Sequence, residues 1–379
     1  GEAAPIEEAP LSLDGLNLEV LSEAFSWLSP RAIARCALVC QSWRDVVLPA
    51  AATRAARLGL SAGSPRALLE LEQREAWRCA SREVTSYDTD TGMQGLAVLR
   101  DGSGTIVSKS FGGNRRSVGL YPAAGEAARG LAGHTADIQA VAADVQEGSG
   151  RIVSGDVNGE MRVWDARTGE ELAVLQHGGL VFAVALDGDT VASGGDDRCA
   201  RLYSLNRQLH TATCECGGAV EGLAICGGLI ATADGAGKTA AVWTLAGEER
   251  HAFPHPAGVL AVAAQGSLLW TGCSDNLVRC FSLATGERLR LLSGHCDAIV
   301  DLSVAGGVLV SVGFRDKSAR LWSVASGDAI ATLSMDGQSI IYAVALCAQR
   351  GFVAIADHDT AGNDENGSRI RVWRPLQYP

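Results

Sequence analysis

One short sequence pattern recurs along most of this chain and limits the folds that it can adopt. The clearest copy runs from Arg151 to Arg167, where strand-forming residues alternate with polar ones and end at a tryptophan and an aspartate. Further copies follow at intervals of about forty residues, which is typical of repeated supersecondary units. Each copy has an aromatic residue near its end: Tyr121, Trp164, Tyr203, Trp243, Phe281, Trp322 and Trp373.

Each copy predicts about four short strands, which cannot bury both of their faces alone. Neighbouring copies must therefore pack side by side, and a set of this size can close into a ring. The sequence thus predicts an all-β seven-bladed propeller over residues 82–379, in which each copy forms one blade.

Four of the copies also share a set of polar residues in the same register. The complete set is His295, Ser311, Asp316 and Trp322. The other three sets are His134, Ser154, Asn158 and Trp164; His177, Ser193, Asp197 and Tyr203; and His255, Thr271, Asp275 and Phe281. With these residues the chain resembles the WD-repeat family. The resemblance implies that each set forms a hydrogen-bonded chain that holds the strands of its blade in order.

The last copy is too short to complete its own blade. Only residues 374–379 follow Trp373, and they are too few and too proline-rich for an outermost strand. The segment from Arg82 to Tyr87 precedes the first predicted inner strand, residues 93–99, and has the right length. We expect this segment to supply the missing strand and close the ring, which would leave no free sheet edge at the junction.

Composition and charge narrow the classes of partner. The chain has 379 residues, of which 47% are hydrophobic and 20% charged, as in a packed globular protein of about two domains. Its 45 glycines are expected at tight turns, since none lies in the strand-to-helix context of a phosphate loop. The net charge of −11 repels phosphate backbones and anionic lipids. Neither nucleic acid nor membrane is therefore an expected partner.

Cysteine usage and the absence of apolar runs indicate the compartment. The 11 cysteines include no Cys-x-x-Cys pair, which favours reduced thiols in the cytoplasm or nucleus. The sequence shows no basic and apolar signal segment at its start and no run long enough to cross a bilayer. We expect a soluble intracellular protein.

The sequence before the repeats has a different composition and a helical pattern of apolar residues. Residues 1–10 are acidic and rich in proline and alanine, and are expected to be disordered. Residues 11–60 predict three short helices, the first with an apolar stripe at three- and four-residue steps. Residues 61–81 predict a linker helix that begins with Ser64 and Pro65. That helix would either fix the distance between two domains or plug the floor of the propeller.

The helical region carries a second resemblance. Residues 16–28, the pair Ser29-Pro30 and the segment Leu-Val-Cys-Gln-Ser-Trp-Arg at 38–44 look like an F-box. The resemblance implies an all-α domain that docks onto the Skp adaptor of a cullin–RING ubiquitin ligase. The residues implied in docking are Leu16, Leu18, Leu21, Phe25, Leu28, Pro30, Leu38, Val39 and Trp43. The alternative is a helical cap on the propeller.

The WD-repeat resemblance also implies where a ligand would bind. In that family, ligand contacts come from the residue after the first apolar residue of each inner strand, and from the residue before the tight-turn aspartate. The first set is Gln94, Gln139, Phe182, Glu221, Leu260, Val300 and Tyr342, and the second is Val157, Asp196, Ser274 and Arg315. The alternative is binding to the sides of the blades.

Enzymatic and metal-binding readings find little support in the sequence. No nucleophile motif and no pair of catalytic carboxylates appears at a recognisable spacing. His251 and His255 stand four residues apart, but Pro254 and Pro256 forbid the helix that would align them on a metal. We expect no cofactor.

The sequence therefore predicts a non-catalytic substrate receptor of a ubiquitin ligase, with an F-box for the adaptor and a propeller for the protein to be ubiquitylated. The alternative is a propeller scaffold that assembles a complex without ubiquitin transfer.

Overall fold

The structure, a computed structural model, describes residues 81–89, 95–99, 104–110, 114–122, 127–143, 150–335, 339–348, 350–359 and 368–375. The nine predicted adaptor-binding residues and Gln94 lie outside these ranges. So do the predicted tail and helical domain, and the predicted linker helix except for Ser81, which opens a strand. The part that the structure describes contains no helix long and apolar enough to span a bilayer.

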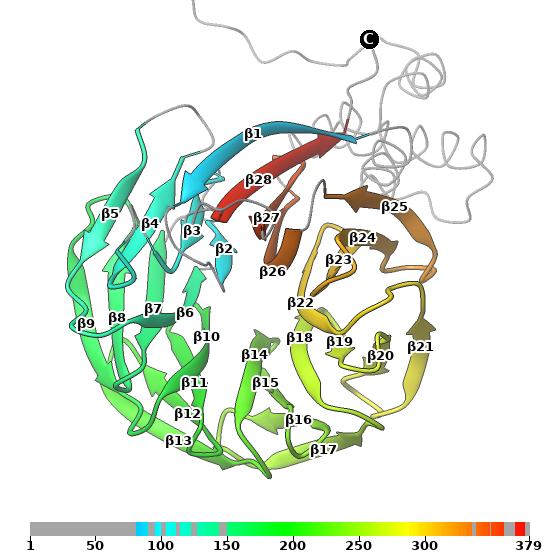
Figure 1. Ribbon diagram of the computed structural model, residues 1–379. Helices are drawn as coiled ribbons and strands as arrows, with labels where there is room; N and C mark the ends of the chain where they lie inside the picture. The colour runs from blue at the N-terminus through cyan, green and yellow to red at the C-terminus, as the bar shows by residue number, and fades with distance from the viewer. Residues whose placement is uncertain are drawn as a thin grey trace, which may run out of the picture. The chain divides into compact units, whose positions relative to one another are not determined.

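The described strands form seven four-stranded antiparallel sheets, arranged as blades around one axis (Figure 1). This arrangement confirms the predicted seven-bladed propeller. Blade one contains β2 (Leu96–Val98), β3 (Ile106–Ser108), β4 (Ser117–Tyr121) and β5 (Arg129–Ala132). Blade two contains β6 (Ile138–Ala143), β7 (Arg151–Asp156), β8 (Glu160–Asp165) and β9 (Glu171–Gln176). Blade three contains β10 (Val181–Asp187), β11 (Thr190–Gly195), β12 (Cys199–Ser204) and β13 (Leu209–Glu215).

The remaining blades repeat this order, with the first strand of each at the axis (Figure 1). Blade four contains β14 (Val220–Cys226), β15 (Leu229–Asp234), β16 (Thr239–Thr244) and β17 (Glu249–Pro254). Blade five contains β18 (Val259–Gln265), β19 (Leu268–Cys273), β20 (Val278–Ser282) and β21 (Arg288–Leu292). Blade six contains β22 (Ile299–Ala305), β23 (Val308–Gly313), β24 (Ser318–Ser323) and β25 (Ala329–Ser334). Blade seven contains β26 (Ser339–Cys347), β27 (Phe352–Asp359), β28 (Ser368–Pro375) and β1 (Ser81–Thr89).

Strand β1 closes the ring by pairing with the last strand of the chain. Its residues lie antiparallel to β28, from Ser81 opposite Pro375 to Thr89 opposite Ser368. In Figure 1 the blue β1 lies beside the red β28 at the outside of blade seven. The predicted closing segment, residues 82–87, falls within β1, so this prediction is confirmed. Closure covers an edge of β28 that would otherwise expose unpaired backbone groups.

Apolar clusters between neighbouring blades form the core. One cluster joins Met161 and Val163 of blade two to Val184 and Val191 of blade three. At the beginning of the inner strands β10, β14 and β22 the neighbouring blades approach closely. A Cβ atom placed on Gly155, for example, would lie 2.6 Å from Val181 Cγ1 of the next blade. Only a very small residue fits there without displacing the neighbouring blade.

The contact between blades six and seven also uses polar groups. Asp301 Oδ2 accepts a hydrogen bond of 2.8 Å from the Val344 N–H, and Ser303 Oγ accepts one of 3.0 Å from the Leu346 N–H. Burial raises the pKa of the Asp301 carboxyl to about 7, although the backbone N–H groups of Val344 and Leu302 oppose this shift. These bonds fix the position of β22 along the direction of β26.

A hydrogen-bonded chain of four side chains crosses blade six, as the WD-repeat resemblance implies. Trp322 Nε1 donates to Ser311 Oγ over 2.8 Å, and Ser311 Oγ lies 2.7 Å from His295 Nε2. His295 Nδ1 bonds to the Asp316 carboxylate. The serine is fully buried, so each of its bonds replaces contacts with water that neither partner can regain.

The chain in blade two ends on a different residue from the one expected. Trp164 Nε1 and His134 Nε2 both bond to Ser154 Oγ, at 2.9 and 2.7 Å. The partner of His134 Nδ1 is Asp156 at 2.9 Å, and not the predicted Asn158. The second carboxylate oxygen of Asp156 accepts the Asn158 N–H, so one aspartate serves the histidine and the turn together.

Blade three departs from the expected chain at the aromatic residue. His177 bonds to Ser193 through Nδ1, at 2.8 Å, and to Asp197 through Nε2, at 3.1 Å, so its ring is turned relative to those of His134 and His295. Tyr203 Oη donates to the Gln176 carbonyl oxygen over 2.7 Å. A phenol reaches further than an indole and finds a backbone acceptor instead.

Blade five lacks the expected link between its histidine and its aspartate. His255 Nε2 bonds to Thr271 Oγ1 at 2.9 Å, but its Nδ1 bonds to the Phe253 carbonyl oxygen. Asp275 pairs with Arg279 instead, at 2.6 Å. Arg279, four residues after Asp275, binds the carboxylate in place of His255. The repeated pattern of the sequence alone does not predict this competition.

We predict that prolines in β1 will destabilise the propeller by opening the ring. Neighbouring residues of an antiparallel strand alternate between bonding to the partner and facing away. The double substitution Ser86→Pro, Tyr87→Pro therefore removes at least one ladder bond, at a cost of about 2 kcal/mol or more. Thermal denaturation followed by circular dichroism should show a lower Tm than for Ser86→Ala, Tyr87→Ala, which keeps both N–H groups. Equal Tm values for the two variants would contradict closure by β1.

A second prediction compares two blades. Ser311→Ala leaves the buried Trp322 Nε1 and His295 Nε2 without a partner, which should cost about 2–4 kcal/mol. Thr271→Val in blade five removes a partner only from His255, since Phe281 has no N–H, and should cost roughly half as much. Urea unfolding measures both. An equal or smaller cost for Ser311→Ala would show that the blade-six chain is not stabilising.

Candidate functional site

The predicted ligand residues of the inner strands share one backbone feature. In six blades the register of the inner strand shifts near its beginning, which leaves one residue without a partner on the second strand. The shift follows the first paired residue in blades two to six and the third in blade seven. These bulged residues are Gln139, Phe182, Glu221, Leu260, Val300 and Tyr342. All six are partly or fully exposed. A β-bulge takes a side chain out of the regular alternation and can aim it at a ligand.

The second predicted set lies on the turns between the second and third strands. The Asp196, Val157 and Ser274 N–H groups each donate to the carbonyl oxygen of the residue just before the neighbouring inner strand, at 2.9–3.2 Å. These turns therefore lie beside the bulges. We call the surface formed by the six bulged residues and these turns the top face.

Blade six places a different residue in this set from the one expected. The N–H that bonds the carbonyl before the inner strand belongs to Phe314, which donates to Ala298 over 2.9 Å. Arg315 is the next residue, because this turn is one residue longer than the turn that contains Asp196 and Asp197. Ile299 pairs with Gly313 as Val181 pairs with Gly195 in blade three, and this alignment identifies Phe314 as the equivalent of Asp196. The sequence alone does not show which residues pair between strands.

Phe314 extends the apolar part of the top face. Its ring lies edge-on to Tyr342, with centroids 5.7 Å apart, and its carbonyl oxygen accepts the Ile341 N–H. The Arg315 guanidinium lies 5.5 Å from the centre of the Phe314 ring, within the range of a cation–π contact. These contacts join Tyr342 and Arg315, two predicted site residues, through a residue that sequence reasoning missed.

Acidic residues occupy the part of the top face between blades three and four. Asp196 is exposed, and its Oδ1 accepts the Leu180 N–H at 2.8 Å. Glu221 is also exposed, but partial desolvation of its carboxyl, together with the nearby Asp234 carboxylate, raises its pKa. A carboxylate in such a position gains from a cationic partner.

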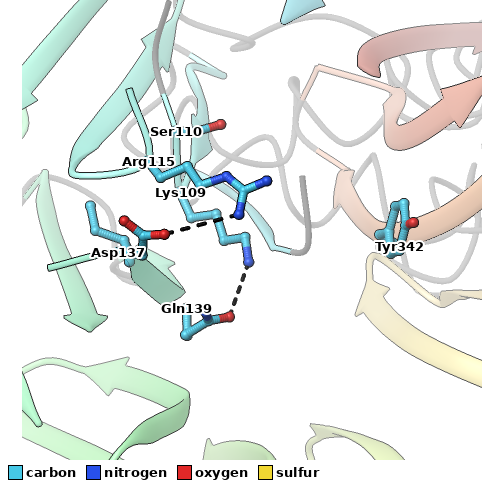
Figure 2. Close-up of a pocket in the computed structure, with 7 residues that line it drawn as sticks. Lys109, Ser110, Arg115, Asp137, Gln139 and Tyr342 are labelled. Carbon is cyan, nitrogen blue, oxygen red and sulfur yellow. Dashed lines mark hydrogen bonds and ion pairs between the residues drawn. The ribbon is translucent and has the colours of Figure 1, made fainter. Parts of the chain in front are cut away.

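A cavity of about 230 Å³ opens on the other side of the top face, at blades one, two and seven (Figure 2). Lys109, Ser110 and Arg115 line it from blade one, and Tyr342 faces them from blade seven (Figure 2). Asp137 and Gln139 complete the polar lining. The Lys109 ammonium donates to Gln139 Oε1 over 3.3 Å, and Arg115 Nη1 lies 4.0 Å from Asp137 Oδ2.

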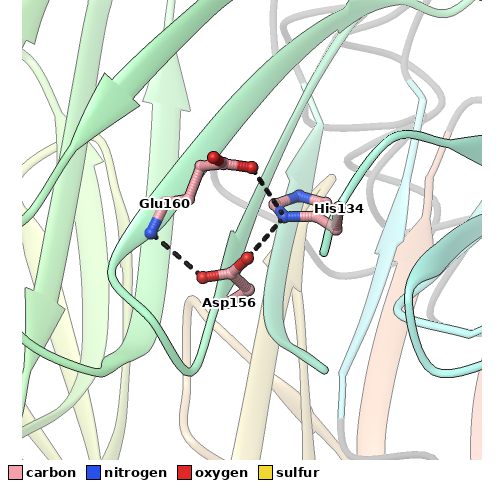
Figure 3. A group of neighbouring side chains, drawn as sticks. All are labelled: His134, Asp156 and Glu160. Atoms are coloured by element: carbon pink, nitrogen blue, oxygen red, sulfur yellow. Dashed lines mark hydrogen bonds and ion pairs between the residues drawn. The ribbon is translucent and has the colours of Figure 1, made fainter. Parts of the chain in front are cut away.

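One group of described residues has the composition of a metal site. The donor atoms of His134, Asp156 and Glu160 lie within 4.8 Å of one another (Figure 3). Each is already used within blade two. His134 bonds to Ser154 and Asp156, and Glu160 Oε1 bonds to Arg162 Nε over 2.7 Å. A metal ion would have to displace these buried bonds, so the geometry is that of a structural network.

Family models match two parts of the chain. The F-box-like model matches residues 18–50, and the model described as WD domain, G-beta repeat matches residues 169–204 and 286–323. The first range includes eight of the nine predicted adaptor-binding residues and leaves out Leu16. The second ranges run from β9 to β12 and from β21 to β24, so each covers the first three strands of a blade and the outer strand before it.

Known proteins are similar to parts of the chain. The crystal structure of the WD40 beta propeller domain of Doa1 superposes with a TM-score of 0.65, over 79% of this chain and 98% of that one, at 16% identity. Eukaryotic translation initiation factor 3 subunit I is 39% identical over 66 residues in Emericella nidulans and 36% identical over 66 residues in Aspergillus terreus. Each of these matches covers 17% of this chain and 20% of the relative. The chain therefore contains an F-box-like sequence at residues 18–50 and WD repeats in a seven-bladed propeller.

Proposed function

We propose that this chain is the substrate receptor of a cullin–RING ubiquitin ligase, in which its F-box binds the Skp adaptor and its propeller binds the protein to be ubiquitylated. The observation that carries the proposal is the presence of an F-box-like sequence and a seven-bladed propeller in one chain. The exposed bulged residues of the top face offer a surface for a protein segment. The receptor would act in the cytoplasm or nucleus.

The proposed mechanism is proximity, without a reacting residue in this chain. A receptor that holds lysines of its substrate beside a charged ubiquitin carrier raises their effective concentration. Positioning of this kind replaces a bimolecular encounter by an effectively unimolecular one. This mechanism needs a stable ring and a stable adaptor contact, and it needs no catalytic group on the propeller.

The top face favours an unphosphorylated segment with an apolar or aromatic anchor. A phosphate dianion is best held by several converging arginine forks. Arg315 lies against the Phe314 ring, while Arg115 and Arg116 lie 3.7–4.0 Å from the Asp137 carboxylate. Phe182, Leu260 and Tyr342 would instead bury an apolar side chain. A basic residue of the segment would face Glu221 or Asp196.

A second candidate function is a scaffold for a protein complex without ubiquitin transfer. The similarity to subunit I of a translation initiation factor favours it, but that similarity covers 66 residues and about a fifth of either protein. In this alternative the F-box-like sequence would be vestigial or would bind another partner. Affinity purification of the chain from cells separates the two candidates, since only the first predicts the Skp adaptor and a cullin among the bound proteins.

We predict that the double substitution Leu38→Ala, Trp43→Ala abolishes adaptor binding. A leucine and a tryptophan in a small helical core contribute several kcal/mol between them. Co-purification of the adaptor measures the effect, and circular dichroism checks that the propeller stays folded. The matched control is Tyr342→Ala, on the top face, which should bind the adaptor normally. Adaptor binding retained by the double variant would refute the F-box assignment.

A further prediction concerns the substrate segment. Proteins that accumulate on the chain when the ligase is inhibited should stay bound after phosphatase treatment. They should be lost from the double variant Leu260→Ala, Tyr342→Ala, since removal of two apolar anchors costs more than 1 kcal/mol at each hot spot. Release by phosphatase, together with normal binding to the double variant, is the opposite result and would require a phosphorylated ligand.

A further inference from the structure

Lys109 occupies a position that is small or apolar in every other blade. It follows Ser108, which pairs with Leu96 as Ser193 pairs with Val184 in blade three. The residues at the equivalent position in blades two to seven are Gly155, Gly194, Ala233, Gly272, Val312 and Ala356. Where this residue is glycine, the first residue of the next inner strand packs directly against it. Blade one thus places a cation at a contact that elsewhere is built for close packing.

The lysine is buried in that contact and reaches the cavity. Only 6% of Lys109 is exposed, and its ammonium is held beside Gln139 of blade two. Burial, together with the neighbouring Arg115, lowers the pKa of Lys109 to about 7, although Asp137 partly opposes both effects. Burial of an ionisable amine at a packing contact is unfavourable, and no other blade has one at this position.

Ser110 provides a second polar group in the lining of the cavity. It lies two residues after Ser108, at the position held by Asp156 in blade two, Asp234 in blade four and Asp357 in blade seven. Ser110 is 1% exposed, and no described residue forms a hydrogen bond with its Oγ. A buried hydroxyl without a partner is costly, and a ligand in the cavity that it lines would satisfy it.

Among the described residues at the cavity, basic side chains outnumber carboxylates. Lys109, Arg115 and Arg116 contribute cations, and the Asp137 carboxylate lies between the two guanidinium groups at 4.0 and 3.7 Å. Tyr342 lines the opposite wall (Figure 2). A ligand that enters between Lys109 and Tyr342 therefore meets more basic than acidic side chains among the described residues.

We propose that this cavity binds one carboxylate of a peptide, either a chain terminus or an aspartate or glutamate side chain, through the Lys109 ammonium and the Ser110 hydroxyl. The inference rests on the proposed function only in that the peptide would belong to the substrate. An ammonium and a hydroxyl match a monoanion. They lack the converging guanidinium forks that favour a phosphate dianion, since Arg115 already faces Asp137.

Binding of this kind is coupled to the protonation of Lys109. A carboxylate bonds to the ammonium form, so the bound state has a higher lysine pKa than the free state. Affinity is then greatest below the free-state pKa of about 7 and falls as the pH rises through it. Between pH 6 and pH 9 the carboxylates stay ionised, and Kd should increase by about tenfold or more.

The chain contains only three lysines, Lys109, Lys238 and Lys317, so lysine-selective ¹³C labelling allows each to be observed by NMR. The full chain would be titrated with N-acetylglycylglycine, which has a terminal carboxylate, and with N-acetylaspartate amide, which has a side-chain carboxylate. N-acetylasparagine amide is the uncharged control. We expect one or both carboxylates to shift the Lys109 signal and raise its pKa, and the compound that does so identifies the source.

Variants test the roles of the two residues. Lys109→Ala restores a residue found at this position in blades four and seven, so it should fold, and it should abolish binding. Ser110→Ala should weaken binding about tenfold, as expected for loss of a hydrogen bond to a charged group. Lys238→Ala, at an exposed turn in blade four, is the matched control and should bind normally. Binding to the variants is followed by the signals of the bound compound.

Three results would overturn the proposal: no response of Lys109 to either carboxylate, unchanged binding by Lys109→Ala, or tighter binding of inorganic phosphate than of both carboxylates. None of these would affect co-purification of the Skp adaptor. Failure of the carboxylate site and failure of the proposed receptor function are therefore distinguishable.

Discussion

Close contact between neighbouring blades, as at the start of β10, β14 and β22, is the constraint on which the ring depends. The first residue of one inner strand fills the space above a glycine in the preceding blade, as Val181 does above Gly155. A larger side chain at such a position would push the two blades apart. Displacements at several such contacts would sum around the ring and prevent its closure. The equivalent position holds glycine or alanine in five blades and Val312 in blade six. These residues let neighbouring blades pack at angles that allow seven of them to close into a ring.

Blade one breaks this rule and gains a polar cavity there. The close contact between the blades explains why one lysine at this position is enough to form the cavity. A long side chain cannot fold back into the packed wall, so it extends toward the top face, where Gln139 accepts its hydrogen bond. The acidic residues Asp196 and Glu221 lie in other blades, so the top face is electrostatically asymmetric. A bound segment would therefore have a preferred direction across the ring.

Much of the fold follows from the sequence because its signals are local and repeated. The spacing of the aromatic residues predicts the blades, and the short segment after Trp373 predicts closure by β1. The bulged residues could be identified from the family pattern alone, since they occupy one fixed place after an apolar residue. The segment before Ser81, with its predicted helices and all of the predicted adaptor contacts, lies outside the described residues, so these features stay predictions.

The details that the sequence did not predict depend on contacts between strands. Asp156 replaces Asn158 because it lies within reach of His134 across the blade, and Arg279 takes Asp275 away from His255. Phe314 enters the site because one turn is a residue longer. The cavity at Lys109 becomes visible only when equivalent positions are aligned by strand pairing, since a lysine after a serine has no meaning in the linear sequence.

The pairing of β1 with β28 joins the two ends of the propeller in sequence, and this has a consequence for the order of folding. Each of blades one to six pairs strands that are consecutive in the chain, so these blades can form while synthesis continues. Blade seven cannot, because its outermost strand is made first and its neighbour last. The entropy of closing so long a loop is lost before the final contacts compensate for it, which makes this step slow. Until β28 is synthesised, β1 has no partner strand, and its backbone N–H and C=O groups stay exposed. A chaperone would therefore be most useful before the chain leaves the ribosome.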